Sequence, residues 1–374
     1  MEVPFYKHQL GNREVVAFQK AISSDILTTG DQVFLFEDEF SSFLGINHSV
    51  CLQSCTAALH LALEAFNFPK GAEVITTPLT FVATTLAILQ AGLKPVFCDI
   101  EISTGNININ KIRDYVTSRT VAVIPVHLFG QMVDMYSLSR VCKEFNLRCI
   151  EDAAHCVEGR RENIRPGQLS DGACFSFYAT KNITCGEGGC FSTNSYELAD
   201  KVRLLRSHGV DKTAIDRYRE GYSHWNLRLN GWKYNLDNLH ASILRPQVPL
   251  IMDKLMKREY AARFYELMLA EVSQVTLIHR HTSLVHARHL FPIKVPAKVR
   301  DDLIVFLAAK GVGAVVNYRC LSNYPTLTSV SIFDNNSFKS SSDFGDSVLS
   351  LPLYPQITRL QLEYVVNCIQ LFFS

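Results

Sequence analysis

Apolar segments of strand length alternate with amphipathic segments of helical periodicity in the first half of the chain. The expected strands lie at residues 50–52, 73–76, 95–98, 120–126 and 147–150. The run at 120–126 is apolar throughout, which is typical of a strand covered on both faces. Strands that alternate with helices predict a mostly parallel sheet with helices packed on both sides, which is an α/β fold.

Several reactive or polar residues directly follow predicted strands. They are Ser54, Asp152, His155, Ser176 and Lys181. In open α/β sheets, ligands bind in the crevice at the carboxyl ends of the strands. We therefore expect these five side chains to converge on one crevice.

Lys181 stands between an apolar strand and the glycine-rich turn at residues 186–189. A lysine that is partly buried loses hydration, which favours its neutral amine. A neutral amine can attack a carbonyl carbon and form a Schiff base. The alternative is a lysine that points out of a loop, because most lysines in proteins are exposed.

The turn at residues 53–56 leads from a short strand into a helix whose apolar face includes Ala58, Leu61 and Ala62. The free N–H groups at the start of such a helix, together with the helix dipole, favour phosphate binding. An ordinary Ser or Thr N-cap explains the same residues. Nothing in the local sequence separates the two interpretations.

The sequence contains no phosphate-binding loop of the form GxxxxGK[ST], no GxGxxG fingerprint and no GxSxG elbow. With these motifs absent, the candidate ligand-binding residues are a lysine, an aspartate after a strand, two hydroxyl-bearing turns and Phe81. Pyridoxal phosphate needs such a set: a lysine for the aldehyde, a carboxylate for the pyridine nitrogen, donors for the phosphate and a flat side chain over the ring.

The length of 374 residues suits a large domain followed by a smaller one. We expect a large pyridoxal-phosphate-binding domain at 1–247, which includes an N-terminal arm, and a small α+β C-terminal domain at 248–374. Within the small domain we expect a strand at 313–316 and a loop tip at 337–342.

Composition excludes several classes of protein. The net charge is +1 with no long charge run, which argues against nucleic acid as a partner. No apolar run approaches a membrane span, and the N-terminus lacks the layout of a signal peptide. The 11 cysteines include no C-x-x-C pair and no zinc-ligand spacing, which favours buried free thiols in a reducing cytoplasm.

The chain resembles the sugar aminotransferases of the DegT/StrS group, which are fold type I pyridoxal phosphate enzymes. The resemblance covers about residues 27–354, and the order and spacing of its motifs are specific. The motifs stand at residues 27–30, 54–60, 77–81, 125–127, 151–155, 175–189, 206–209, 234–235 and 351–354.

The resemblance implies the roles of the residues around the cofactor ring. Lys181 is expected to be the Schiff-base lysine and the base that moves the proton between substrate and cofactor. Asp152 is expected to pair with the pyridinium nitrogen, His155 to lie near the phenolic oxygen and Phe81 to stack on the ring. Taken one at a time, a helix cap, a core histidine or a core aromatic explains the last three residues equally well.

The resemblance also implies a phosphate site and a substrate-facing residue. The backbone of Cys55 and Thr56 and the Ser176 hydroxyl are expected to hold the phosphate. Asn235 is expected to reach the phosphate from the neighbouring subunit, which places the active site at the interface of a homodimer. Tyr318 stands where such enzymes often carry a tyrosine that faces the substrate.

The histidine-rich stretch at residues 279–289 suggests a metal site. We reject that interpretation, because these histidines lie on a strand-like stretch without carboxylate partners. We expect His289 to face the substrate instead.

The function implied by the resemblance is a cytoplasmic aminotransferase that moves the amino group of glutamate to a nucleotide-linked keto-sugar. The runs at 77–81, 206–209 and 288–290 look most like enzymes that act at C4 of a 4-keto-6-deoxy sugar, in the synthesis of surface polysaccharide or glycoconjugates. Three alternatives stay open: a ketocyclitol or 3-keto-sugar aminotransferase, a pyridoxal-phosphate-dependent sugar dehydratase, and a non-catalytic regulatory protein that binds the cofactor. Relatives that remove a sugar hydroxyl often carry histidine in place of Lys181.

Overall fold

A computed structural model describes residues 1–212, 224–331 and 338–374. Its central sheet has seven strands in the order β1-β8-β7-β5-β4-β2-β3. Pairing is parallel from β7 through β5, β4 and β2 to β3, whereas β8 is antiparallel to both β7 and β1. The expected mostly parallel sheet is therefore confirmed. The strands are β1 His48–Leu52, β2 Glu73–Thr76, β3 Lys94–Phe97, β4 Thr120–Val123, β5 Arg148–Asp152, β7 Gly172–Ser176 and β8 Gly189–Thr193.

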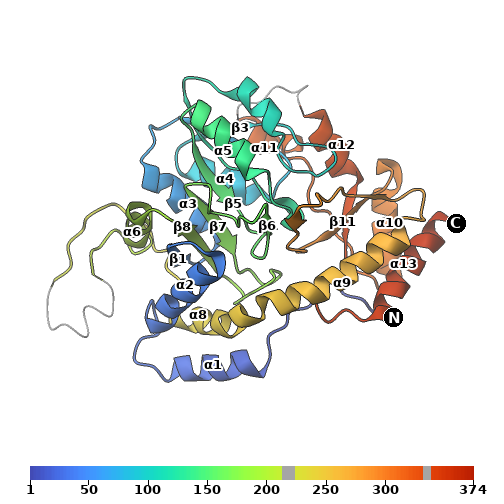
Figure 1. Cartoon of the computed structure of the whole chain (residues 1–374), viewed down its shortest axis with the longest axis horizontal. Helices are drawn as coiled ribbons and strands as arrows, with labels where there is room; N and C mark the ends of the chain where they lie inside the picture. The colour runs from blue at the N-terminus through green and yellow to red at the C-terminus, as the bar shows by residue number, and fades with distance from the viewer. Residues whose placement is uncertain (213–223, 332–337) are drawn as a thin grey trace.

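Helices cover both faces of this sheet (Figure 1). Successive strand residues enter different buried clusters: Ile75 and Val123 belong to one, and Val74 and Ala122 to the other. Burial on both faces explains why the strands read as continuous apolar runs. The covering helices are α2 Asp31–Leu44, α3 Cys55–Phe66, α4 Val82–Gln90, α5 Met135–Glu144, α6 Tyr196–Leu205 and α8 Asn238–Leu244. Short 3₁₀ segments are η1 Ile109–Tyr115, η2 Leu128–Gly130 and η3 Arg245–Leu250.

The C-terminal part of the chain has a hydrophobic core of its own. The long helix α9 Ile251–Leu269 runs from the large sheet toward this part (Figure 1). This part is an antiparallel sheet in the order β12-β11-β9 with helices against it. Its elements are β9 Thr276–Leu277, β11 Phe291–Lys294, α10 Ala297–Ala309, η4 Leu321–Asn323, α11 Pro325–Thr328, α12 Lys339–Ser347, β12 Val348–Leu351 and α13 Arg359–Phe373. A further two-stranded pair joins β6 Arg160–Arg161 to β10 Leu284–Val285.

Two local expectations for this part are wrong. Residues 313–316 form no strand, because only single bridges join Val312 to Val3 and Val315 to Ser350. Residues 339–342 open α12 rather than a loop tip, and Ser337 lies outside the described residues. The pairing of Val3 also brings the N-terminus into the C-terminal core. That contact joins residues more than 300 positions apart, so local sequence does not reveal it.

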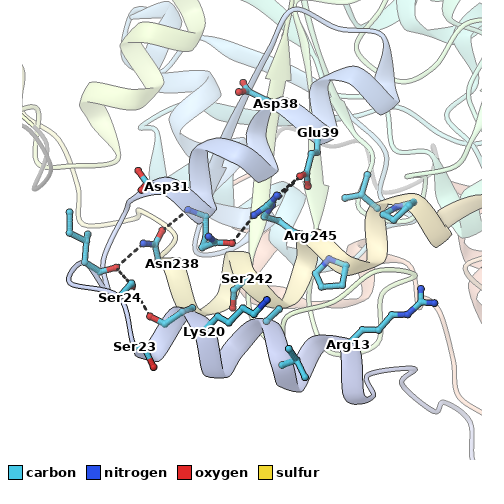
Figure 2. Close-up of a pocket in the computed structure, with 18 of the residues that line it drawn as sticks. Arg13, Lys20, Ser23, Ser24, Asp31, Asp38, Glu39, Asn238, Ser242 and Arg245 are labelled. Carbon is cyan, nitrogen blue, oxygen red and sulfur yellow. Dashed lines mark hydrogen bonds and ion pairs between the residues drawn. The ribbon is translucent and has the colours of Figure 1, made fainter.

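The N-terminal arm carries α1 Asn12–Ile22, which lies beside α8 and is tied to the large unit through Asn238 (Figure 2). The Asn238 amide donates to the Ile26 carbonyl and accepts from the Gln32 N–H. Gly30 is required there, because a Cβ would lie 2.5 Å from Asn238 Nδ2. A hollow of about 1550 Å³ opens between these elements and shares no lining residue with the pocket around Lys181.

Among the described helices, none combines the length and the apolar character that a membrane span requires.

Candidate active site

A cavity of about 530 Å³ opens at the carboxyl ends of the parallel strands. The five residues that were expected to converge there all line it. Of the ten residues that were expected to contact the cofactor or the substrate, eight line this cavity: Cys55, Thr56, Phe81, Asp152, His155, Ser176, Lys181 and Tyr318. His289 and Asn235 lie elsewhere.

Lys181 sits in a tight loop that follows β7. The loop is closed by hydrogen bonds from the Lys181 N–H to the Tyr178 carbonyl and from the Thr184 hydroxyl to the Phe177 carbonyl. Burial lowers the pKa of the Lys181 amine to about 8, although Cys55 and Asp152 oppose this shift. The lysine is therefore not an ordinary solvated surface charge.

Asp152 ends β5 and is 6% exposed. Its Oδ2 accepts a 2.8 Å hydrogen bond from the Thr84 hydroxyl, and its Oδ1 accepts one from the Ala154 N–H. Burial raises the pKa of this carboxyl, and the two hydrogen bonds and Lys181 oppose that rise. Thr80 lies 3.0 Å from the Thr84 hydroxyl and continues the network.

His155 is buried between Phe129 and Tyr318. Its Nδ1 accepts from the Phe129 N–H at 3.3 Å, so the proton of the neutral ring is on Nε2, 3.2 Å from the Tyr318 hydroxyl. Burial, and then the nearby Lys181 charge, hold the pKa of His155 well below its usual range. His155 is thus a neutral N–H donor in the cavity.

The turn before α3 forms the polar end of the cavity. The Ser54 hydroxyl caps the helix by accepting from the Ala57 N–H, so the N-cap interpretation is confirmed. The first four backbone N–H groups of an α-helix have no acceptor within the helix. Ser54 caps one of them and leaves others of this turn available. Cys55 and Thr56 at this turn and Ser176 at the end of β7 line the cavity, which gives it donors suited to a phosphate.

Phe81 is a large aromatic side chain that is 57% exposed, and its ring lies 5.8 Å from the Tyr318 ring. An aromatic ring exposed at the wall of a cavity is available to cover a flat ligand. It is not plain core, which was the alternative interpretation.

His289 lines a smaller cavity of about 70 Å³ that adjoins the first through Lys181, Asn317 and Tyr318. The N-terminal residues Phe5 and Tyr6 line it too, and the Tyr6 hydroxyl donates to the Ala179 carbonyl beside the lysine loop. Sequence reasoning did not include the N-terminal segment, because its contact with residue 179 spans 173 positions.

Asn235 does not line either cavity. Its amide nitrogen donates to the Thr29 hydroxyl at 2.8 Å, and its oxygen accepts from Lys233. Its expected contact with the phosphate of a neighbouring subunit therefore stays a prediction.

The residues present fit pyridoxal phosphate. A lysine with a lowered pKa, a buried carboxylate, a helix start with free N–H groups and an exposed aromatic ring share one cavity. Across the three described ranges, no three His, Cys, Asp or Glu side chains are grouped as they would be to hold a metal ion.

Comparison with known proteins agrees with this class of enzyme. The family model for the DegT/DnrJ/EryC1/StrS aminotransferases matches residues 8–370. The chain is 34% identical to the uncharacterised protein MJ1066 of Methanocaldococcus jannaschii, covering 98% of this chain and 97% of that protein. It is also 34% identical to the spore coat polysaccharide biosynthesis protein SpsC of Bacillus subtilis, covering 98% and 96% of the two chains.

Among solved structures, the chain superposes on Helicobacter pylori PseC, an aminotransferase involved in the biosynthesis of pseudoaminic acid. The TM-score is 0.93 with 28% identity, covering 100% of this chain and 99% of PseC. The chain belongs to the DegT/DnrJ/EryC1/StrS aminotransferase family. It is a transaminase, and its cofactor is pyridoxal phosphate.

Proposed function

We propose that this transaminase moves the amino group of glutamate to a nucleotide-linked keto-sugar, at C4 of a 4-keto-6-deoxy sugar. The observation that carries the proposal is Lys181, an amine of pKa about 8 in the same cavity as a buried aspartate. The resemblance of SpsC and PseC to this chain supports a sugar as the acceptor and surface polysaccharide or glycoconjugate synthesis as the purpose.

When bound, pyridoxal phosphate supplies an aldehyde for amines and a ring that stabilises negative charge on the reacting carbon. Lys181 would bind that aldehyde, and would also accept and return the proton of the reacting carbon. A pKa near 8 suits both tasks at neutral pH, because neutral and protonated amine are both populated.

The other residues hold and orient the cofactor. Asp152 would keep the ring nitrogen protonated, His155 would lie near the phenolic oxygen, and Phe81 would cover the ring. The Cys55 and Thr56 N–H groups and the Ser176 hydroxyl would bind the phosphate.

Tyr318 and His289 face the substrate in this proposal. The small cavity beside Lys181 that they line combines apolar walls from Leu351 and Leu353 with polar groups from Tyr6 and Asn317. A deoxy-sugar presents both kinds of surface, so this mixed lining supports a sugar substrate.

We further propose a cytoplasmic homodimer in which Asn235 completes the phosphate site of the partner subunit. The 11 cysteines support a reducing compartment, since all are buried and free. We also propose that the chain divides into a large pyridoxal-phosphate-binding domain at 1–247 and a small domain at 248–374.

The test is the absorbance spectrum of the protein with pyridoxal phosphate, before and after glutamate is added, for wild type, Lys181→Ala and Lys298→Ala. Lys298 is exposed at the start of α10 and is the matched control. We expect a visible band in wild type and control that glutamate removes, and no such band in Lys181→Ala.

Candidate keto-sugars are then added to the glutamate-treated enzyme. Return of the band with a 4-keto-6-deoxy sugar, and an amino-sugar product, support the proposal. Return only with a ketocyclitol or 3-keto-sugar establishes the aminotransferase alternative. Water loss without glutamate indicates a dehydratase, and a band that glutamate leaves unchanged indicates a binding protein.

A further inference from the structure

A chain of hydrogen bonds connects the Lys181 amine to a buried ion pair at α9. Lys181 Nζ lies 3.4 Å from His289 Nε2, and His289 Nδ1 lies 3.2 Å from Asn182 Oδ1. Asn182 Nδ2 donates to Glu158 Oε2 at 2.7 Å, and Glu158 Oε1 pairs with Arg258. Three of the five residues, His289, Glu158 and Arg258, are buried, at 7%, 1% and 2% exposure.

The orientation of the Asn182 amide follows from its neighbours. Its nitrogen lies within hydrogen-bond distance of two acceptors, the Glu158 carboxylate and the Ala287 carbonyl at 3.0 Å. A carbonyl oxygen only accepts hydrogen bonds, so the amide oxygen cannot take that position. Oδ1 therefore points at His289.

The orientation of Asn182 determines the tautomer of His289. Because Nδ1 faces an acceptor, Nδ1 carries the proton. Burial, followed by the charges of Lys181, His155 and Arg258, holds the pKa of His289 well below its usual range, so the ring is neutral. The Nε2 lone pair is then free to accept from the Lys181 amine.

His155 has the opposite tautomer. Its Nδ1 accepts from the Phe129 backbone, and its Nε2 carries the proton. The centroids of the two rings are 4.4 Å apart. One histidine of the pair is thus a donor in the cavity and the other is an acceptor beside the lysine.

We propose that Asn182, anchored by Glu158, is a positioning residue that locks His289 in the tautomer whose Nε2 accepts a hydrogen bond from Lys181. The inference rests on the proposed role of Lys181 as the lysine that binds the cofactor. While Lys181 holds the proton of the reacting carbon, His289 stabilises the ammonium and turns it toward a fixed side of the cavity. No proton leaves the lysine for the histidine.

The hydrogen bond has a measurable effect on the lysine. The titratable groups near Lys181 are Tyr6, Cys55, Asp152, His155, His289 and Tyr318. An acceptor stabilises the protonated amine, so its loss lowers the lysine pKa. Hydrogen bonds to charged groups are worth enough to shift the pKa by about one unit.

The first experiment reads the tautomer in the cofactor-free wild type. The ring nitrogens of protein labelled with ¹⁵N-histidine are observed by NMR, and His289 is assigned with His289→Gln. We expect a protonated Nδ1 and an unprotonated Nε2 from neutral pH upward. The opposite tautomer, or a doubly protonated ring at neutral pH, overturns the proposal.

The second experiment follows the rate at which added pyridoxal phosphate forms the visible band, as a function of pH. Asn182→Leu keeps the branched shape of the side chain and removes all three hydrogen bonds of the amide. We expect its apparent lysine pKa to fall by about one unit and the His289 tautomer to change. Asn110 is exposed on η1, so the control variant Asn110→Asp should show the wild-type dependence of the rate on pH.

The proposal is overturned if folded Asn182→Leu shows the wild-type dependence of the rate on pH and an unchanged His289 tautomer. If Asn182→Leu does not fold, Asn182→Ser replaces it. Failure of the proposed function would give a different result. If Lys181 does not bind the cofactor, Lys181→Ala still forms the visible band, whereas the tautomer of His289 in the wild type is unaffected.

Discussion

The Thr84 hydroxyl donates a 2.8 Å hydrogen bond to Oδ2 of Asp152, so the first turn of α4 supports the carboxylate at the end of β5. Burial raises the pKa of that carboxyl, and the hydrogen bond from Thr84 is the largest of the effects that oppose the rise. The bond favours the ionised form of Asp152, which is the form that our proposal requires beside a protonated ring nitrogen.

Thr84→Val should lower the rate of the glutamate half-reaction about 10- to 150-fold, since a hydrogen bond to a charged group is worth about 1.5–3 kcal/mol. The rate is measured from the loss of the visible band under saturating glutamate. Thr85→Val is the control, because the Thr85 hydroxyl is buried with no hydrogen-bond partner among the described residues. Equal rates in the two variants would show that Thr84 does not support Asp152.

Lys181→Met should stabilise the cofactor-free protein at pH 7. The folded pKa of about 8 lies below the usual 10.5, so the unfolded chain binds more protons between these values and the wild type gains stability as the pH rises. The expected gain of the variant is about 1–3 kcal/mol at pH 7 and shrinks toward pH 10. Thermal unfolding from pH 7 to 10 measures it; a gain independent of pH would contradict the pKa argument.

Arg258→Met should destabilise the protein by about 3–5 kcal/mol, because the buried Glu158 carboxylate loses the cation that pairs with it. The free energy of unfolding in urea is the measurement. The double variant Arg258→Met with Glu158→Gln removes the unpaired charge and should recover part of the loss. A double variant less stable than Arg258→Met would show that the charge is not the cause.

Gly189→Ala should weaken binding of pyridoxal phosphate at least tenfold. A Cβ on Gly189 would lie 2.2 Å from the Ser54 carbonyl carbon and 2.4 Å from the Cys55 nitrogen, so the turn before α3, where we propose that the phosphate binds, must move. Cofactor titration followed by absorbance measures the change. Gly11→Ala is the control, since its nearest neighbour would be Glu14 Oε2 at 3.9 Å; similar weakening there would contradict the steric argument.

Much of the site was predictable because parallel strands align their carboxyl ends. Once β5 and β7 are recognised as apolar runs, Asp152 and Lys181 must lie at the same edge of the sheet. The sequence signal failed where only single bridges form, as at 313–316, because an isolated apolar run looks the same whether or not it pairs.

The partners of the predicted residues were not predictable. Thr84 precedes Asp152 by 68 positions, and Asn182 precedes His289 by 107. Thr84 is one of several threonines near Phe81, and only the packing of α4 against the sheet selects it. Glu158 and Arg258 are 100 positions apart and read separately as ordinary charged residues.

The sequence by itself determined the α/β class and singled out the candidate reactive groups, because periodicity and residue chemistry are local properties of the chain. The tertiary structure alone decided the lowered pKa of Lys181, the raised pKa of Asp152 and the opposite tautomers of His155 and His289. These properties depend on desolvation and on hydrogen-bond partners that distant segments supply, and such partners exist only after the segments have packed together.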